Sequence, residues 1–204
     1  FNKHVAKSII AASGIKVAEH QIVSYNDFLD EKVMSRPYVV KPLNEGSSVG
    51  VFIVQDGDDF EPKKQDWDFG DNVMIERFIP GRELTVTVMG DRPLAVTEVI
   101  TERNFYDYDA KYINGGSKHI IPADIPEAIY DETLRVSLLA HKSLECRGLS
   151  RVDIRYDGTN IYVLEVNTQP GMTPTSLVPE QAAYLGISFN ELVIWLVENA
   201  ACDA

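Results

Sequence analysis

The 204-residue chain has no apolar segment near the roughly 20 residues that a membrane-spanning helix needs. Its longest candidate, residues 192–197, lies within a short predicted helix, and the sequence carries no signal peptide. A membrane partner is therefore not expected. The sequence begins at Phe1 rather than Met, so we expect a natural N-terminal part to precede it.

Cysteine is scarce, and basic residues are outnumbered. Cys146 and Cys202 are far apart and lack a CxxC or metal-ligand spacing, which predicts a reducing, cytoplasmic setting. The chain has 19 Lys and Arg against 31 Asp and Glu, a formal charge of −12. That balance argues against binding a nucleic-acid backbone, whereas a small anionic substrate remains compatible if basic side chains gather locally.

What is present is the composition of an ordinary globular protein, with 45% hydrophobic and 25% charged residues. Helix and strand patterns alternate without the regular spacing of a doubly wound sheet, which favours an α+β fold with antiparallel sheets. The patterns predict helices at residues 2–14, with Asn2 as its cap, at 24–34 and at 126–147, and a final helix that opens with a capping box at residues 188–191. They predict strands at 17–23, 38–41, 51–54, 73–79, 83–89 and 94–100.

A hinge is expected at Pro80 and Gly81, between two lobes at residues 1–79 and 80–204. Residues 102–121 hold aromatic and charged side chains without a clear period. A loop of that length inside a compact domain is usually functional or disordered, so we interpret it as a lid.

Two strand-like segments near the C-terminus, joined by the turn residues 157–160, end in oxygen-bearing side chains. Strand periodicity puts one set on a common face of the first segment, namely Arg151, Asp153 and Arg155, and another set on a common face of the second, namely Ile161, Val163, Glu165 and Asn167.

A three-residue loop at 158–160 would set Asp153 opposite Glu165 and Arg151 opposite Asn167, whereas a two-residue loop would break that pairing. Two carboxylates ~4 Å apart repel by about 4 kcal/mol at an effective dielectric near 20. Mg²⁺, which shares its ligands with substrate phosphates, would remove that cost. The alternative is a solvent-facing hairpin edge with solubilising charges.

The segment KPLNEGSSVG at residues 41–50 lies between two predicted strands. Its glycines let backbone N–H groups turn toward phosphates, and Lys41 adds a positive charge. It is not a Walker A motif, and a simple hairpin loop would look similar. Residues 75–83 form the connection between lobes, where Glu76 could meet an adenine amino group and Glu83 a ribose, or where an ordinary polar linker could run. Lys3 taken alone is most often a solvated charge.

Taken together in this order, the segments resemble the ATP-grasp ligases, and more narrowly the D-alanine–D-alanine ligase family. The resemblance covers essentially the whole chain and is most specific in residues 41–50, 105–112, 151–153, 165–173 and 176–179. It implies an ATP-grasp fold that clasps a nucleotide between two α+β lobes. It further implies phosphate contacts from Lys3 and Lys41, adenine and ribose contacts from Glu76, Arg77, Ile79 and Glu83, and two Mg²⁺ ions, or Mn²⁺, on Asp153, Glu165 and Asn167.

The resemblance also implies the chemistry: ATP phosphorylates the carboxylate of one D-alanine, and the amine of a second attacks the acyl phosphate, in peptidoglycan precursor synthesis. Implied roles are oxyanion stabilisation by Arg151, contact with the γ-phosphate by Lys111, binding of the second carboxylate by Ser176 and the backbone of Leu177, and hydrogen bonding across the site by Ser47 and Tyr112.

The sequence departs from the family at two positions. Family members commonly have Arg or Lys in place of Asn44 and Lys in place of Arg77, and both changes are peripheral or conservative. The larger departure is the family's N-terminal domain, which holds the first D-alanine and has no counterpart here. The implied partners are therefore ATP, D-alanine and that domain. The resemblance is also compatible with a homodimer of the full-length enzyme. The remaining alternatives are a nucleotide-binding module without catalysis and an ATP-grasp ligase for another carboxylate–amine pair.

Overall fold

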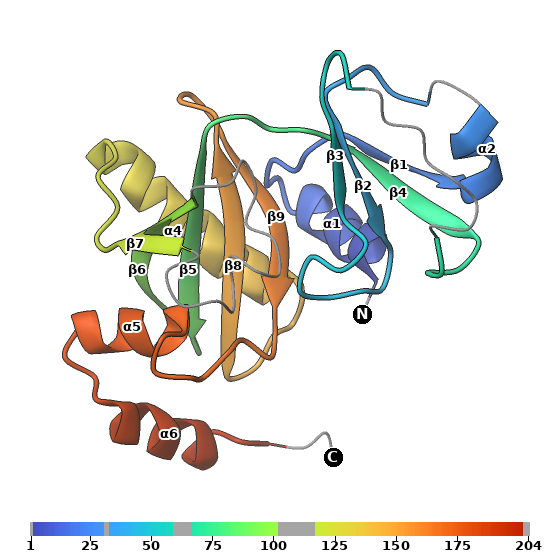
Figure 1. Cartoon of the computed structure of the whole chain (residues 1–204). Coiled ribbons are helices and arrows are strands. Elements are labelled where there is room, and N and C mark those ends of the chain that lie inside the picture. Colours follow the sequence, from blue (N-terminus) through green and yellow to red (C-terminus); the bar gives the residue numbers. More distant parts are fainter. Residues whose placement is uncertain (1, 31–32, 59–66, 102–116, 202–204) are drawn as a thin grey trace.

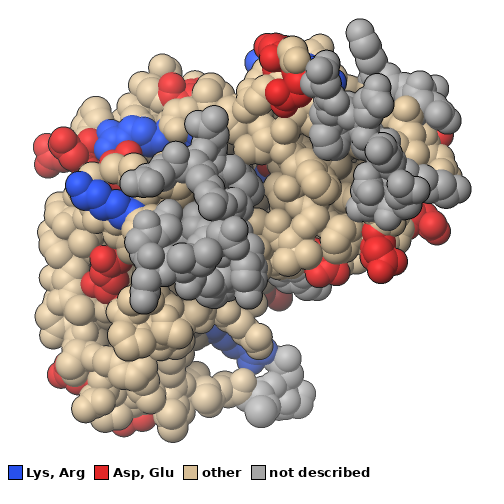
Figure 2. Space-filling view, viewed as in Figure 1, with Lys and Arg blue, Asp and Glu red and all other residues tan. Residues whose placement is uncertain are grey.

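The computed structural model of the chain describes residues 2–30, 33–58, 67–101 and 117–201. Two antiparallel sheets lie side by side, each with helices against it (Figure 1). Within the described residues, no helix is both long and apolar enough to cross a lipid bilayer. On the face in Figure 2, the described acidic and basic side chains are scattered rather than gathered by sign.

The smaller sheet has the strand order β1-β4-β2-β3. Its core combines buried strand residues such as Val40 and Ile75 with the aromatic side chains of Tyr25 and Phe28. Its elements are β1 (His20–Ser24), α2 (Tyr25–Asp30), β2 (Tyr38–Pro42), β3 (Phe52–Val54) and β4 (Asn72–Arg77).

The larger sheet has the order β7-β6-β5-β8-β9. Helix α4 lies along one of its faces, with α5 and α6 at one end (Figure 1). Its elements are β5 (Arg82–Met89), β6 (Arg92–Thr101), β7 (Ser117–Ile120), α4 (Glu127–Ser143), β8 (Leu149–Tyr156), β9 (Ile161–Asn167), α5 (Leu177–Tyr184) and α6 (Phe189–Glu198).

Helix α1 (Lys3–Ala12) begins where the sequence predicts it, because the Asn2 side chain accepts a hydrogen bond from the Val5 N–H. Its buried residue Ile10 belongs to the core of the larger sheet, together with Ile15. The chain passes from one sheet to the other between Arg77 and Arg82. The division into lobes at residue 79 stays a prediction.

Several element boundaries differ from expectation, and among them α2 ends at Asp30 rather than at Met34. Strand β1 begins at His20, and Val17 makes only an isolated bridge to Val163. Helix α4 ends at Ser143 rather than near 147, because Glu145 adopts the left-handed conformation (φ 53°) that interrupts a helix. Residues 117–120 of the expected lid form β7, paired with β6, while residues 102–116 lie outside the described part of the chain.

Candidate functional site

A cavity of about 820 Å³, counting its solvent-open part, lies between the two sheets. It brings together residues far apart in the sequence from α1, β2, the 43–51 loop, β4, the 78–81 connection and the β8–β9 hairpin. The predicted site residues that line it are Lys3, Lys41, Ser47, Glu76, Arg77, Ile79, Glu83, Asp153 and Glu165.

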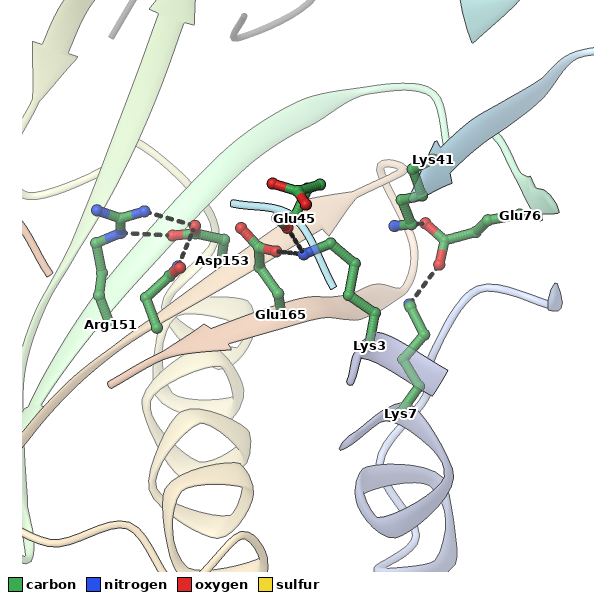
Figure 3. A network of polar contacts seen from close by, with 9 residues as sticks. Lys3, Lys7, Lys41, Glu45, Glu76, Arg151, Asp153 and Glu165 are labelled. Carbon is green, nitrogen blue, oxygen red and sulfur yellow. Dashed lines mark hydrogen bonds and ion pairs between the residues drawn. The ribbon is translucent and has the colours of Figure 1, made fainter. Parts of the chain in front are cut away.

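At the inner wall of this cavity, the carboxylate of Glu76 lies between two ammonium groups (Figure 3). Lys41 Nζ lies 2.8 Å from Glu76 Oε1, and Lys7 Nζ lies 2.6 Å from Glu76 Oε2. Lys7 is 1% exposed and Glu76 is 2% exposed. Water solvates neither charged group, so the charged form of each is stabilised by the opposite charge of the other.

Burial lowers the pKa of Lys7 below its ordinary value, against the attraction of Glu76. Burial would by itself raise the pKa of Glu76, but the charges of Lys41 and Lys7 outweigh it and hold that pKa below the usual range. Glu76 is thus a buried carboxylate engaged by two lysines. Its predicted contact with adenine stays a prediction.

Lys3, at the first position of α1, links three segments of the site. Its backbone N–H donates to the Leu43 carbonyl, its ammonium group donates to the Glu45 carbonyl, and Nζ lies 3.5 Å from Glu165 Oε2. The start of α1 is thereby joined both to the 43–51 loop and to the acidic hairpin. This Lys3 is not the solvated surface charge that its position alone would suggest.

The loop after β2 is held in a conformation that costs energy. Ser47 and Ser48 both have positive φ, 51° and 60°, although neither is glycine, and such residues cost of order 1–3 kcal/mol each. Strain of this kind clusters at ligand sites. Gly50, also at positive φ (68°), has no room for a side chain, because a Cβ there would lie 2.6 Å from the Phe69 ring.

The β8–β9 hairpin has the predicted pairing, with Asp153 opposite Glu165 and Arg151 opposite Asn167. The reason differs from the predicted one. Near the turn Tyr156 pairs with Ile161, which is one residue out of that register, and a bulge at Leu164 restores it.

The bulge also corrects the predicted face of β9. Val163 and Ile161 point into the core of the larger sheet, while Leu164 and Glu165 face the cavity. The residues predicted to share one face of this strand, Ile161, Val163, Glu165 and Asn167, therefore do not share it. The inserted residue is what lets a single strand bury its first half and present a carboxylate from its second half.

The Asp153 carboxylate is hydrogen-bonded from three sides. Arg151 donates to both of its oxygens at 2.9 and 2.8 Å, Thr85 Oγ1 to Oδ1 at 2.8 Å, and Asn167 Nδ2 to Oδ2 at 2.8 Å. Arg151 and Asp153 are drawn in Figure 3 as a two-point ion pair. A cation that binds Asp153 must replace some of these contacts.

The donor set fits a hard divalent cation that is shared with phosphate. Asp153, Glu165 and Asn167 offer two carboxylates and one amide oxygen from adjacent strands. Across the described ranges, no group of three or more His, Cys, Asp or Glu side chains is arranged to hold a metal ion by itself. The three residues can hold an ion whose shell is completed by phosphate or water oxygens.

Arg155 fixes the connection between the sheets. Its guanidinium donates to the Ile79 carbonyl at 3.1 Å, to the Gly81 carbonyl at 2.9 Å and to Glu83 at 3.3 Å, and it lies 5.7 Å from the Phe78 ring centroid. Two of the predicted base and ribose residues are therefore anchored by β8. Another of these four residues, Arg77, is exposed and donates its backbone N–H to the Glu19 carbonyl.

Ser176 and Leu177 stand at the start of α5 and do not line the cavity. Ser176 Oγ accepts from the Thr173 N–H at 3.0 Å and lies 2.8 Å from Thr173 Oγ1. Two further predicted residues, Lys111 and Tyr112, lie outside the described residues.

The sequence analysis did not identify Lys7 or Thr85 as site residues. Lys7 follows Lys3 by four residues and so shares its helix face, which is the signal that could have found it. Thr85 is itself buried, within a continuous run of buried residues in β5, and has no comparable signal.

Comparison with known proteins shows the family to which the chain is similar. Residues 9–198 match the family described as D-ala D-ala ligase C-terminus. The chain is 56% identical to a D-alanine–D-alanine ligase of Rhodospirillum rubrum, over the whole chain and 68% of that protein. Among solved structures, a Bacillus anthracis D-alanine–D-alanine ligase complexed with ATP aligns with TM-score 0.74 at 28% identity, over 97% of this chain and 65% of that one. The VanG D-Ala:D-Ser ligase of Enterococcus faecalis aligns with TM-score 0.78 at 26% identity, over 97% of this chain and 60% of that one. The chain thus spans about two thirds of the length of these proteins.

Proposed function

Because the chain belongs to the D-alanine–D-alanine ligase family, we propose that it forms the ATP-grasp portion of an enzyme that joins two D-alanines for peptidoglycan precursor synthesis. The family uses ATP and a divalent metal and has the ATP-grasp fold, here two antiparallel sheets with helices. The observation that carries the proposal is one cavity lined both by lysines and by the paired carboxylates of Asp153 and Glu165.

In this proposal Lys3 and Lys41 bind the ATP phosphates. Lys41 is held in the cavity wall by Glu76, whose remaining charge Lys7 balances. Adenine and ribose lie along the 76–83 segment, where the Arg77 to Ile79 backbone and the Glu83 carboxylate line the cavity. Arg155 holds that backbone in place before any ligand binds, which lowers the cost of ordering it.

Asp153, Glu165 and Asn167 would hold two Mg²⁺ ions, with Mn²⁺ as a substitute. When bound, these ions neutralise phosphate charge and so allow the carboxylate of the first D-alanine to approach the γ-phosphate. The Arg151 guanidinium, which donates to both Asp153 oxygens, would lie beside the reacting carbonyl. It stabilises the oxyanion that forms when the second amine attacks the acyl phosphate.

Ser176 and the Leu177 N–H would receive the carboxylate of the second D-alanine at the start of α5. Ser47, on the strained loop, would hydrogen-bond with Tyr112 across the site, and Lys111 would reach the γ-phosphate. These contacts keep water from the labile acyl phosphate. In the full-length enzyme, the N-terminal domain that the family resemblance implies would hold the first D-alanine.

Two consequences belong to the same proposal. The 204 residues bind nucleotide but do not make dipeptide alone, because the first substrate lacks its positioning domain. The enzyme works in the cytoplasm, where ATP is supplied, and its full-length form is compatible with a homodimer.

The similarity to a D-Ala:D-Ser ligase favours one second candidate, a ligase that accepts a different amine. Phosphate release by the full-length native chain tests both candidates, with D-alanine alone and with D-alanine plus D-serine. Phosphate release and D-alanyl-D-alanine formation with D-alanine alone support the proposal. Phosphate release only when D-serine is added supports the second candidate, and none with either amino acid contradicts both.

A further inference from the structure

Helix α5 carries a fully buried amide at the centre of its packing face. Gln181 is 0% exposed and lies among Leu177, Val178 and Ala182, which are 4% exposed or less. Gln181 follows Leu177 by four residues, so it lies on the same helix face, about 6 Å further along the axis. A buried amide is costly unless its donor and its acceptor are both matched.

Both ends of this amide are matched by the backbone of one strand. Gln181 Oε1 accepts the Thr87 N–H at 2.7 Å, and Gln181 Nε2 donates to the Thr85 carbonyl at 3.2 Å. The β5–β6 register shifts between Val86 and Val88, so this is an irregular point of the ladder. Gln181 therefore satisfies the hydrogen bonding of backbone groups at a bulge. Its two hydrogen bonds fix the position of α5 relative to β5, both parallel and perpendicular to the strand.

The same short piece of β5 supports the metal-binding carboxylate. The Thr85 hydroxyl, whose carbonyl Gln181 binds, donates to Asp153 Oδ1 at 2.8 Å. Thr87 pairs with Arg151 on β8, and Thr85 pairs with Asp153. The start of α5 is thus connected through Gln181 and β5 to both Asp153 and Arg151.

We propose that Gln181 is a positioning residue that sets the start of α5, and with it Ser176 and the Leu177 N–H, relative to Arg151 and Asp153. It thereby determines where the carboxylate of the amine-donating amino acid is held. This inference rests on the proposed function and deepens it, because it assigns the placement of the second substrate to a residue that touches no substrate. A helix moves as a rigid unit, so an error at Gln181 is transmitted one turn to Leu177.

The test is steady-state kinetics of the full-length native enzyme with Gln181→Met, which keeps the side-chain length and removes both hydrogen bonds. We expect the KM of the second D-alanine to rise at least about tenfold, since an error of 1 Å in position can cost ~10²-fold. The KM values of ATP and of the first D-alanine should stay within about twofold, because Gln181 makes no contact with the nucleotide cavity. The matched control is Ser137→Ala, which removes a buried hydroxyl that donates to the Thr133 carbonyl in α4, and should leave all three KM values unchanged.

An unchanged KM for the second D-alanine, or an equal rise in all three KM values, overturns the inference. An unmodified enzyme that makes no dipeptide overturns the proposed function, and this inference with it, so the two failures are distinguished by the unmodified enzyme. If Gln181→Met does not fold, amide hydrogen exchange of the unmodified chain decides instead. The Thr87 N–H should be among the slowest to exchange, and rapid exchange would show that Gln181 does not hold it.

Discussion

Lys7 Nζ and Glu76 Oε2 lie 2.6 Å apart in a nearly water-free position behind the cavity, although one belongs to α1 and the other to β4. The pair joins a helix that packs on the larger sheet to a strand of the smaller one. It also leaves the second Glu76 oxygen for Lys41. The contact therefore couples the docking of the two sheets to the position of a proposed phosphate-binding lysine.

Replacing Lys7 by Met should destabilise the chain strongly, because it leaves the buried Glu76 charge with one partner instead of two. Breaking a buried pair by removing one member costs about 3–5 kcal/mol. Urea unfolding measures the loss. Adding Glu76→Gln to Lys7→Met should recover at least half of it, since the uncompensated charge is then gone.

The control for this experiment is Lys16→Met, since Lys16 is exposed and its ammonium group donates to the Asn160 side chain. Its unfolding free energy should change by less than about 1 kcal/mol. Equal losses for the Lys7 and Lys16 variants would contradict the account of the buried pair.

Gly81 is a second sensitive point, in the connection between the sheets. Its φ is 101°, and a Cβ there would lie 2.2 Å from the Tyr156 carbonyl oxygen. Gly158→Ala is the matched control, because its φ is similar, 98°, and no atom lies within 4 Å of the Cβ position. We expect Gly158→Ala to cost about 1–2 kcal/mol from backbone strain, and Gly81→Ala at least about 2 kcal/mol more. Chemical denaturation of both variants gives the difference, and equal losses would show that the connection can shift to accept a side chain.

The metal prediction follows from the three donors that surround Asp153. Mg²⁺ alone should bind weakly, because it must displace Arg151, whereas ATP supplies phosphate oxygens that complete the shell. We expect Mg²⁺ to strengthen ATP binding at least about tenfold, and Asp153→Asn with Glu165→Gln to reduce that effect to less than about twofold. Calorimetry with and without Mg²⁺ measures both.

Asp157→Asn is the control for the metal experiment, because Asp157 belongs to the same hairpin but caps the turn N–H groups of Thr159 and Asn160. Tight Mg²⁺ binding in the absence of nucleotide would contradict this prediction.

Local sequence signals predicted the parts of the fold that depend on neighbours in the chain. The Asn2 cap and the Ser188–Glu191 capping box are both observed, and each is a contact within three residues. The hairpin pairing of Asp153 with Glu165 was also predicted, but the bulge at Leu164 that produces it was not. The position of a bulge depends on which side chains are buried in the core, and the residues of the turn do not indicate this.

Contacts between distant segments were beyond local reasoning. Nothing near Lys7 in the sequence indicates that its partner is Glu76, and nothing near Gln181 indicates a backbone irregularity in β5. Both are long polar side chains that are usually exposed, so composition favours the wrong environment for each. The family resemblance predicted residues that line the cavity but not Lys7 and Thr85, the buried residues that contact Glu76 and Asp153.

The most direct test of the central claim, that the cavity between the sheets binds Mg²⁺–ATP, is calorimetric titration of the 204-residue chain with Mg²⁺–ATP. The comparison is with Lys41→Met and with the control Lys142→Met, an exposed lysine on α4. We predict one nucleotide per chain, an affinity at least about tenfold weaker for Lys41→Met, and no change for Lys142→Met. Absence of binding to the unmodified chain, or equal affinity in all three proteins, would contradict the account.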